Sequence, residues 1–433
     1  MELYQDIIYN KFILSNKYYN IVLKDEQYYT YLYYYDIMNV YALFPTIIDI
    51  DLSIIHTHEN LNDLTNRLNN KDKYEFNDQN INLDFKLLEE KINILKFTEK
   101  ELKTRIRGQV RKLFSYEIID ELKNNYNAEY VTTAWMKSYE IIEKYKLLTN
   151  SGDDINYFGI CEQPGAFIYS INHWCKTHSK KFNFTVQSLI DQNNPKIFKP
   201  EQKLFSKYKD NYDYGYDKTG DVTNLTNIKY YRKKYYDKHF DIITADCGLD
   251  CSDDFMKQEI NLSKVIIAQV ILAISLADTN SNYFFKLFTV YQKQTKQIIY
   301  LLTNLFEQVY LCRTLTTKPE SGEIYCICKK FKYTKKETDY LMDELYRWYD
   351  DQKNNLINIP DDFYNKINDF NRITYYRRIT SINFLYFRFK NNNYAQEKRE
   401  IYDYVNKLVK HYQEYFIKLY NINKLSDQDK LII

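Results

Sequence analysis

Two charged side chains stand inside otherwise apolar runs of this sequence. Asp246 closes the run FDIITAD, and Lys286 lies in the middle of YFFKLF. A charged amine is costly to bury in such a run unless it faces a site or a partner. Desolvation and nearby cations could lower the pKa of that amine. The simpler alternatives are a lysine that reaches solvent from a strand end and a carboxylate that caps a helix or turn.

Two further charged residues flank this pair in the sequence. Lys137 lies in TTAWMKSYEII, which is typical of a helix, and Glu323 begins the apolar run EIYCIC. Taken singly, Lys137 is best explained as a solvated helix lysine and Glu323 as a carboxylate at the rim of a sheet. Seven of the eight glycines fall between Gly152 and Gly322. We therefore expect tight turns, and the chemistry, in this part of the chain.

The elements that must position these residues alternate between short apolar runs and helical stretches. This alternation predicts an α/β fold with a Rossmann-like, mostly parallel sheet covered by helices on both faces. The last two strands are separated by only about ten residues, Arg313 to Gly322, too few for a helical crossover. They should form an antiparallel hairpin at one edge of the sheet. The expected strands contain INYFGIC, FNFTV, FDIITA, YFFKLF, QVYLC and EIYCICK, and a long helix is expected from Gln258 to Ala277.

The chain is longer than one hydrophobic core normally organises, so we expect three parts. Residues 112–333 should hold the α/β domain, between mostly helical regions at 1–111 and 334–433. The 60 basic and 58 acidic side chains nearly balance, so overall charge indicates no partner. Seven cysteines without framework spacing favour a reducing compartment, and no structural zinc is expected. No leader and no run of 18 apolar residues is found, which predicts an intracellular protein that does not span a membrane.

The turn after the first strand of the domain is the candidate for cofactor binding, because ligands bind outside the carboxyl ends of strands in open α/β sheets. It has a glycine where the backbone must approach a ligand closely. The phosphate-binding pattern G-x-G-x-x-G is absent, so S-adenosyl-L-methionine, which has no phosphate, fits better than NAD. The turn contains Cys161, Glu162, Pro164, Gly165, Ala166 and Phe167.

The order Lys, Asp, Lys, Glu resembles the catalytic tetrad of FtsJ-like (RrmJ-type) RNA ribose 2′-O-methyltransferases. The segments TTAWMK, CEQPGAFIYSINH, YDKTGDV, TADCGLDC, FFKLFT and SGEIYCIC resemble motifs of this family, over roughly Tyr126 to Phe331. The wording CE-x-PGAFI, followed by TGD, is most similar to Adrift-type cap 2′-O-methyltransferases of eukaryotes and large DNA viruses. The resemblance implies a Rossmann-like methyltransferase domain that uses S-adenosyl-L-methionine and requires no metal.

The resemblance also implies residue roles. Lys286 would favour the alkoxide of a ribose 2′-hydroxyl, and Lys137 and Glu323 would orient it. Asp246 would hold Lys286 and face the methyl-donor end of the cofactor. Asp221 of TGDV would meet the adenine amino group. The implied cofactor-binding set is Cys161, Glu162, Pro164, Gly165, Ala166, Phe167, Gly220, Asp221 and Asp246.

The sequence departs from the family pattern in two places. Ala166 stands where many relatives have a second glycine, and Gln187 and Ser188 follow FNFTV where an acid is common. Ribose recognition should therefore differ. His173 and His178, on the helix after the cofactor turn, are interpreted as packing or surface residues.

RNA phosphates must be met by local basic patches, because the net charge is only +2. Each candidate patch is also compatible with an ordinary solvated face. The favoured patch, just upstream of Lys137, comprises Arg105, Arg107, Arg111 and Lys112. The others comprise Lys229, Arg232, Lys233 and Lys234, and Arg372, Arg377, Arg378, Arg388 and Lys390.

The leading hypothesis is an mRNA cap 2′-O-methyltransferase whose partner is the capped 5′ end of mRNA, with a capping-machinery partner or a homodimer left open. A viral enzyme of this kind would be cytoplasmic, and any other nuclear or cytoplasmic. One alternative is a ribosomal or transfer RNA 2′-O-methyltransferase, against which the large flanking regions weigh. The other is a catalytically silent RNA-binding scaffold subunit, against which the intact tetrad argues.

Overall fold

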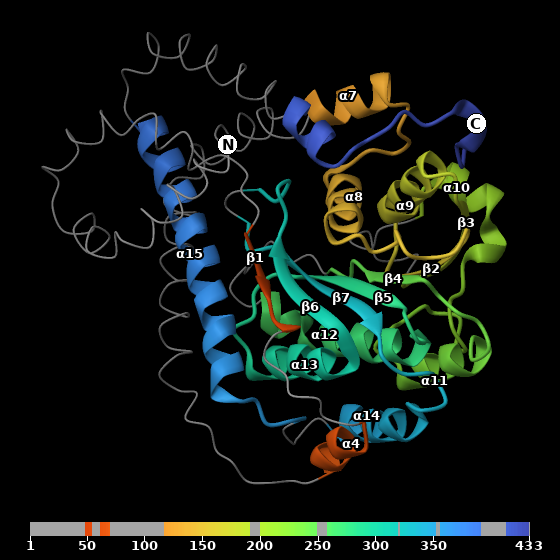
Figure 1. Ribbon diagram of the computed structural model, residues 1–433, viewed down its shortest axis with the longest axis vertical. Coiled ribbons are helices and arrows are strands. Elements are labelled where there is room, and N and C mark those ends of the chain that lie inside the picture. Colours follow the sequence, from red (N-terminus) through yellow and green to blue (C-terminus); the bar gives the residue numbers. More distant parts are fainter. Residues whose placement is uncertain are drawn as a thin grey trace, which may run out of the picture. The chain divides into compact units, whose positions relative to one another are not determined.

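The chain is built around a mixed β-sheet with helices on both faces (Figure 1). The computed structural model describes residues 48–53, 61–69, 117–190, 200–248, 258–318, 321–351, 356–390 and 413–432. Within them the sheet has seven strands in the order β1-β6-β7-β5-β4-β2-β3, which confirms the α/β fold class. The strands are β1 (Ile48–Asp51), β2 (Asp154–Ile160), β3 (Lys181–Gln187), β4 (Ile242–Ala245), β5 (Asn282–Leu287), β6 (Phe306–Arg313) and β7 (Ile324–Phe331).

The predicted strands form where the sequence has apolar runs. β3, β2, β4 and β5 are parallel neighbours, and β6 and β7 form the predicted antiparallel hairpin. The predicted place of this hairpin at the sheet edge is wrong, because β1 pairs antiparallel with β6 and lies outside it. The sequence did not predict β1 because its alternation of apolar and acidic residues covers only four positions, Ile48 to Asp51, within a region expected to be mostly helical.

The helices form two layers, one on each face of the sheet (Figure 1). One layer holds α7 (Glu117–Asn125), α8 (Thr133–Tyr145), α9 (Ala166–Thr177) and α10 (Gln202–Lys207), followed by the 3-10 turn η4 (Lys209–Asn211). The opposite layer holds α11 (Leu225–Lys234), α12 (Gln258–Leu276) and α13 (Lys293–Leu305), and α14 (Asp339–Asp351) packs on the outer side of α11 and α12. Outside them lie α4 (Leu61–Asn69), α15 (Asp361–Lys390) and the 3-10 turn η6 (Asp427–Asp429).

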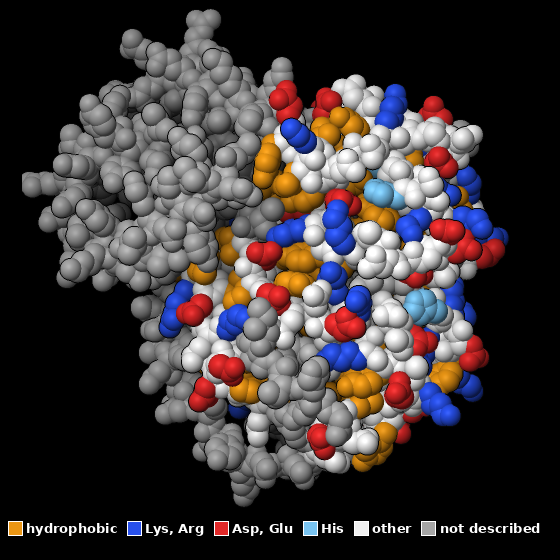
Figure 2. All heavy atoms as spheres, in the orientation of Figure 1, with side chains coloured by type: hydrophobic (Ala, Val, Ile, Leu, Met, Phe, Trp, Pro, Cys, Tyr) orange, Lys and Arg blue, Asp and Glu red, His pale blue; other side chains and the backbone are white. Residues whose placement is uncertain are grey.

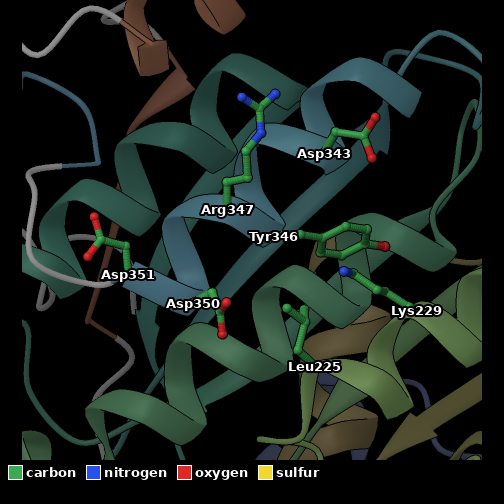
Figure 3. A pocket seen from close by; sticks show the side chains of 7 residues that line it. All are labelled: Leu225, Lys229, Asp343, Tyr346, Arg347, Asp350 and Asp351. Atoms are coloured by element: carbon green, nitrogen blue, oxygen red, sulfur yellow. The ribbon is translucent and has the colours of Figure 1, made fainter.

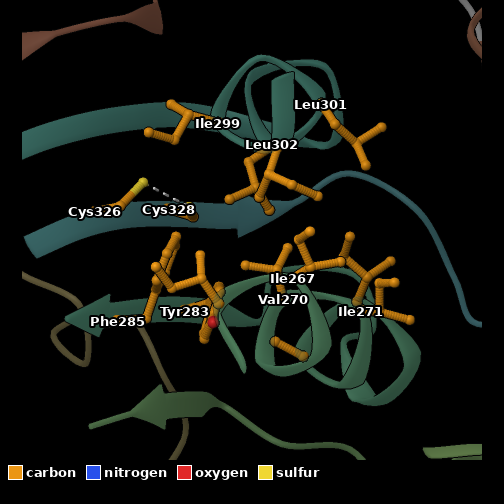
Figure 4. Packing of buried hydrophobic residues seen from close by; sticks show 14 of the residues in the cluster. Ile267, Val270, Ile271, Tyr283, Phe285, Ile299, Leu301, Leu302, Cys326 and Cys328 are labelled. Atoms are coloured by element: carbon orange, nitrogen blue, oxygen red, sulfur yellow. Dashed lines mark hydrogen bonds between the residues drawn. The ribbon is translucent and has the colours of Figure 1, made fainter. Parts of the chain in front are cut away.

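α12 confirms the predicted long helix and is the centre of the second layer. Its length and composition would allow it to cross a membrane, but 72% of its most apolar window is buried inside the protein. Figure 4 shows Ile267, Val270 and Ile271 of α12 in the same apolar cluster as Tyr283 and Phe285 of β5. α12 is therefore explained as a core helix, apolar on most sides because it is covered on most sides.

The end of the chain returns to the α8 and α9 layer. The His173 ring on α9 is buried and lies 2.8 Å, through Nε2, from the Asn423 carbonyl oxygen. Burial lowers the pKa of His173 to about 4, so the ring is neutral. The backbone N–H of Leu431 donates to Glu129, which precedes α8, at 2.8 Å. His173 is thus a packing residue that helps to fasten the C-terminal segment to the domain.

Candidate active site

Lys137, the first tetrad candidate, lies on a buried face of α8. The helix starts where the Thr132 hydroxyl accepts a hydrogen bond from the Trp135 N–H, 3.2 Å away. Trp135 is fully buried, and Lys137 is only 8% exposed. The Nζ atom of Lys137 lies 2.5 Å from Oε1 of Glu323. The fold thus pairs two predicted residues that are 186 positions apart.

The other two candidates meet at the carboxyl ends of neighbouring parallel strands. Asp246 follows β4, and Lys286 lies near the end of β5. Lys286 Nζ is 2.6 Å from Asp246 Oδ1 and 3.2 Å from the Asp246 carbonyl oxygen. Successive side chains of a strand face opposite sides of the sheet, so Lys286 faces the same side as Phe284, which packs in the α8 layer. All four tetrad candidates therefore gather on the α8 side.

The charges of this cluster set the protonation of Lys286. Burial lowers its pKa, but attraction by Asp246 and Glu323 outweighs burial and leaves the pKa above its ordinary value. The prediction of a lowered pKa is wrong for the free protein, because the nearest charges are carboxylates and not cations. Burial raises the pKa of Glu323, but Lys137 and Lys286 together hold it below its ordinary value. At neutral pH the Lys286 amine therefore carries its proton.

Tyr325 is a fifth member of the cluster that sequence reasoning missed. Its hydroxyl donates a hydrogen bond to Glu323 Oε1 at 3.0 Å, and its backbone pairs with Lys286 across the β5–β7 ladder. Burial and the neighbouring Glu323 hold the pKa of Tyr325 well above its ordinary value, so the hydroxyl remains a donor. The sequence could have indicated Tyr325 through its spacing from Glu323. Residues two positions apart in an extended segment face the same side, and Glu323 directly precedes β7.

The cofactor turn leads from β2 into α9. Gly165 stands at the start of the helix with φ +118°, where glycine is favoured, and no side chain caps the helix from that position. Instead, Glu162 Oε1 accepts a hydrogen bond from the Phe167 N–H at 2.9 Å. Burial, reinforced by Asp246, raises the pKa of Glu162 to about 8. Its Oε2 atom is buried and accepts no hydrogen bond from the described residues. The chain's own carboxyl group thus fills the N-terminal end of α9.

A second turn presents Asp221 toward the same end of the sheet. Gly220 has φ +67°, and a Cβ added there would lie 1.8 Å from the Ser188 carbonyl oxygen, so this turn requires glycine. Asp221 Oδ1 accepts hydrogen bonds from the N–H and hydroxyl of Thr223, both at 2.8 Å. No hydrogen bond to Oδ2 of Asp221 is found from the described part of the chain.

Gln187 and a disulfide join the two turns to each other and to Asp246. Gln187 is fully buried, accepts a hydrogen bond from the Cys161 N–H at 3.1 Å and donates one to the Gly220 carbonyl oxygen. It therefore holds the turns together at the position where relatives commonly carry an acid. Cys161 is bonded to Cys247, 86 residues away. The cysteine spacing did not indicate this pair, which forms because β2 and β4 are neighbours in the sheet.

Two other kinds of site do not compete with the tetrad. In the described ranges, no group of three or more His, Cys, Asp or Glu side chains could hold a metal ion. A surface hollow of about 620 Å³ lies between α11 and α14 (Figure 3). Leu225 and Lys229 line it together with five side chains of α14, from Asp343 to Asp351. It contains acids and bases together, and Lys229 of the second basic patch is the one predicted site residue that lines it.

The basic patches have different outcomes. The favoured one, Arg105, Arg107, Arg111 and Lys112, lies outside the described residues and stays a prediction. In the second, Arg232 is buried and pairs with Asp339 at 2.6 Å, and Lys234 pairs with Asp213 at 2.7 Å. These two are occupied by structural ion pairs. Figure 2 shows acidic and basic side chains interspersed over the described part of the visible face.

The comparison with protein families identifies the domain. Residues 130–331 match the model of the FtsJ-like methyltransferase family. This range includes all four tetrad candidates and both cofactor turns. The chain therefore contains an FtsJ-like methyltransferase domain, and the resemblance seen in the sequence is confirmed.

Similar proteins extend this result. The cap-specific mRNA (nucleoside-2′-O-)-methyltransferase 2 of Drosophila melanogaster is 27% identical over 241 residues, which are 53% of this chain and 34% of that protein. A "probable methyltransferase" of African swine fever virus is 28% identical over 242 residues, 52% of this chain and 55% of that protein. This chain thus spans about a third to about half of the length of these relatives. A crystal structure from Plasmodium falciparum, described as a ribosomal RNA methyltransferase, covers 47% of this chain at 20% identity and a TM-score of 0.33.

Proposed function

We propose that this chain is an S-adenosyl-L-methionine-dependent 2′-O-methyltransferase that acts on the ribose of cap-proximal mRNA nucleotides. The observation that carries the proposal is the pair of contacts Lys137–Glu323 and Lys286–Asp246, assembled from four distant segments on one side of the sheet. The FtsJ-like domain supports methyl transfer to RNA. The names of the relatives support a cap-proximal acceptor.

The two turns fit a cofactor without phosphates. The N-terminal end of α9, where a dinucleotide pyrophosphate would bind, is filled by the carboxyl group of Glu162. The Asp221 carboxylate suits the adenine amino group, and Gly165 and Gly220 let the backbone approach a ligand closely. When bound, S-adenosyl-L-methionine supplies an electrophilic methyl group on a sulfonium. Cys161, Pro164, Ala166, Phe167 and Asp246 complete the proposed cofactor-binding set.

The tetrad supplies what a ribose hydroxyl lacks. A 2′-hydroxyl is a poor nucleophile because it holds its proton far above neutral pH. Lys286 accepts the hydroxyl proton in its neutral form, which is the minor form at neutral pH in the free protein, and the cation so formed stabilises the charge on the attacking oxygen. Asp246 fixes the position of this amine through their 2.6 Å contact. Lys137 and Tyr325 both bind Glu323 Oε1, which orients the carboxylate toward the acceptor side of the cluster.

The proposal is tested by methyl transfer from labelled S-adenosyl-L-methionine to matched capped and uncapped RNAs, with the modified nucleotide mapped. We expect label on the ribose of the first or second transcribed nucleotide of capped RNA. Capped transcripts that differ in these nucleotides should react at comparable rates, because the 5′ end and phosphate contacts set the position. Raising the salt concentration should weaken RNA binding steeply.

Two results would contradict this assignment in different ways. Equal transfer to internal riboses of uncapped structured RNA would favour a ribosomal or transfer RNA enzyme. Binding of capped RNA without product from any acceptor, even with cell extract added, would favour a scaffold subunit. A cap-directed enzyme would act in the cytoplasm or nucleus. Pull-down with capping enzymes would reveal a partner, and measurement of the oligomeric state would reveal a homodimer.

A further inference from the structure

A covalent bond crosses the candidate site between its two halves. Cys161 lies in the cofactor turn after β2, and Cys247 directly follows Asp246 after β4. The ladder between these strands ends at the pair Ile160 and Ala245. The disulfide therefore restrains the two turns just beyond the point where the sheet stops restraining them.

Through Cys161, the disulfide is connected to the turn that carries Asp221, the residue proposed to bind the adenine. The Cys161 N–H donates to the side-chain oxygen of Gln187 at 3.1 Å, and the amide of Gln187 donates to the Gly220 carbonyl oxygen. Gly220 immediately precedes Asp221. A movement of Cys161 would thus be transmitted to both turns that the cofactor is proposed to contact.

Through Cys247, the disulfide is connected to the reacting groups. Asp246, the neighbour of Cys247, holds the Lys286 amine at 2.6 Å. Gly248, which follows Cys247, lies close to the same amine: a Cβ added to Gly248 would be 3.3 Å from Lys286 Nζ. The backbone around Cys247 therefore forms one wall of the space around this amine.

Residue exposure distinguishes this pair from the other described cysteines. Cys161 is partly exposed, whereas Cys247 is buried. The free cysteines Cys175, Cys312, Cys326 and Cys328 are all buried. Thiol–disulfide exchange requires a thiolate to reach one sulfur of the bond, and of the two bonded residues Cys161 is the more exposed.

We propose that Cys161 and Cys247 form a reversible redox modification site that controls cofactor affinity. Two glutathione thiols reduce the bond: they supply two electrons and two protons, Cys161 and Cys247 become thiols, and one glutathione disulfide forms. Oxidation by glutathione disulfide is the reverse. The bond holds the cofactor turn beside Asp246, so we expect the oxidised form to bind the cofactor more tightly. The identity of the cofactor rests on the proposed function.

The test uses the full chain equilibrated in glutathione buffers of stepped ratio. Alkylation and peptide mass spectrometry follow the Cys161–Cys247 link, and calorimetry measures S-adenosyl-L-methionine binding at each end of the series. Reduction should lower the affinity on the order of tenfold, because the turns lose their preorganisation, and reoxidation should restore it. Cys161→Ser and Cys247→Ser should show the reduced affinity under both conditions, and Cys175→Ala should respond as the unaltered chain does.

The outcomes separate this proposal from the proposed function. Equal affinity in both redox states would overturn the switch and leave the methyltransferase proposal intact. Binding in neither state would overturn both. Failure to find the Cys161–Cys247 peptide at any ratio, or a link from either residue to Cys251 instead, would overturn the pairing. The comparison of oxidised and reduced unaltered chain decides the matter even if a serine variant does not fold.

Discussion

Lys286 is the side chain on which the proposed chemistry depends most directly. We predict that Lys286→Ala abolishes methyl transfer and changes cofactor affinity little, because the amine acts on the acceptor hydroxyl. Turnover measured beside calorimetric cofactor binding checks both parts. Lys264→Ala, an exposed lysine of α12, should retain turnover and binding. If Lys286→Ala kept a tenth of the turnover, an effect of only about 1.4 kcal/mol, Lys286 would not be the group that activates the hydroxyl.

Tyr325 gives a second prediction at the scale of single residues. Tyr325→Phe removes the hydroxyl that donates to Glu323 Oε1 at 3.0 Å. A hydrogen bond to a charged group contributes about 1.5–3 kcal/mol, so turnover should fall roughly ten- to a hundredfold at unchanged cofactor affinity. Tyr283→Phe is the matched control, because this buried hydroxyl on β5 has no hydrogen-bond partner among the described residues. An equal loss of turnover in both variants would mean that Tyr325 acts only through packing.

The sequence predicted the elements that carry the tetrad because their patterns are local. β4, β5 and β7 are apolar runs buried on both faces, and a lysine inside such a run is conspicuous. What it could not predict depends on tertiary distances. The raised pKa of Lys286 follows from a 2.6 Å contact with Asp246, and the bridging role of Gln187 follows from two turns that meet only in the fold.

The turn that carries Asp221 gives a prediction at the scale of elements. Gly220→Ala would force a residue with a side chain into φ +67° and place its Cβ 1.8 Å from the Ser188 carbonyl oxygen. We expect a loss of about 1–3 kcal/mol in folding stability and weaker cofactor binding, because the turn must shift. Thermal denaturation and calorimetry measure the two effects. Gly152→Ala, where an added Cβ meets nothing within 4 Å, should change neither. Unaltered cofactor affinity in Gly220→Ala would place Asp221 outside the adenine site.

At the scale of the whole molecule, the residues that match the family model do not form a complete hydrophobic core by themselves. Residues 130–331 include neither β1, which covers the edge of β6, nor the segment 413–432. That segment contributes Phe416, Tyr420 and Ile422 to the core on the α8 side. Its carbonyl at Asn423 also binds the buried ring of His173. The flanking regions therefore complete the core of the domain, whatever further role they have in RNA binding.

Buried carboxyl groups should make the stability of the whole molecule depend on pH. Burial is the main cause that raises the pKa of Glu162 to about 8 and that of Glu140 to about 7. In the unfolded chain both ionise near pH 4.3, so above that pH the folded state binds more protons and stability falls as pH rises. His173 has the opposite effect on stability, because burial lowers its pKa to about 4. Its contribution makes stability rise with pH up to about pH 6.5, the pKa of an unfolded histidine, and does not change above it. Between about pH 6.5 and 8 the carboxyl groups therefore determine the slope.

Glu162→Gln isolates the larger of these contributions. Glutamine keeps an oxygen for the Phe167 N–H but cannot ionise, so the variant should lose the fall in stability that Glu162 causes. That fall amounts to about 2 kcal/mol between pH 6.5 and 8, since one pKa unit corresponds to about 1.4 kcal/mol. Thermal denaturation at steps from pH 5 to pH 8 should show a flatter profile for Glu162→Gln and a higher melting temperature than the unaltered chain at pH 8. Glu307→Gln, which alters an exposed carboxylate on β6, should leave the profile unchanged. A profile for Glu162→Gln as steep as that of the unaltered chain would show that Glu162 is already ionised at neutral pH, and that the end of α9 is occupied by a charged carboxylate.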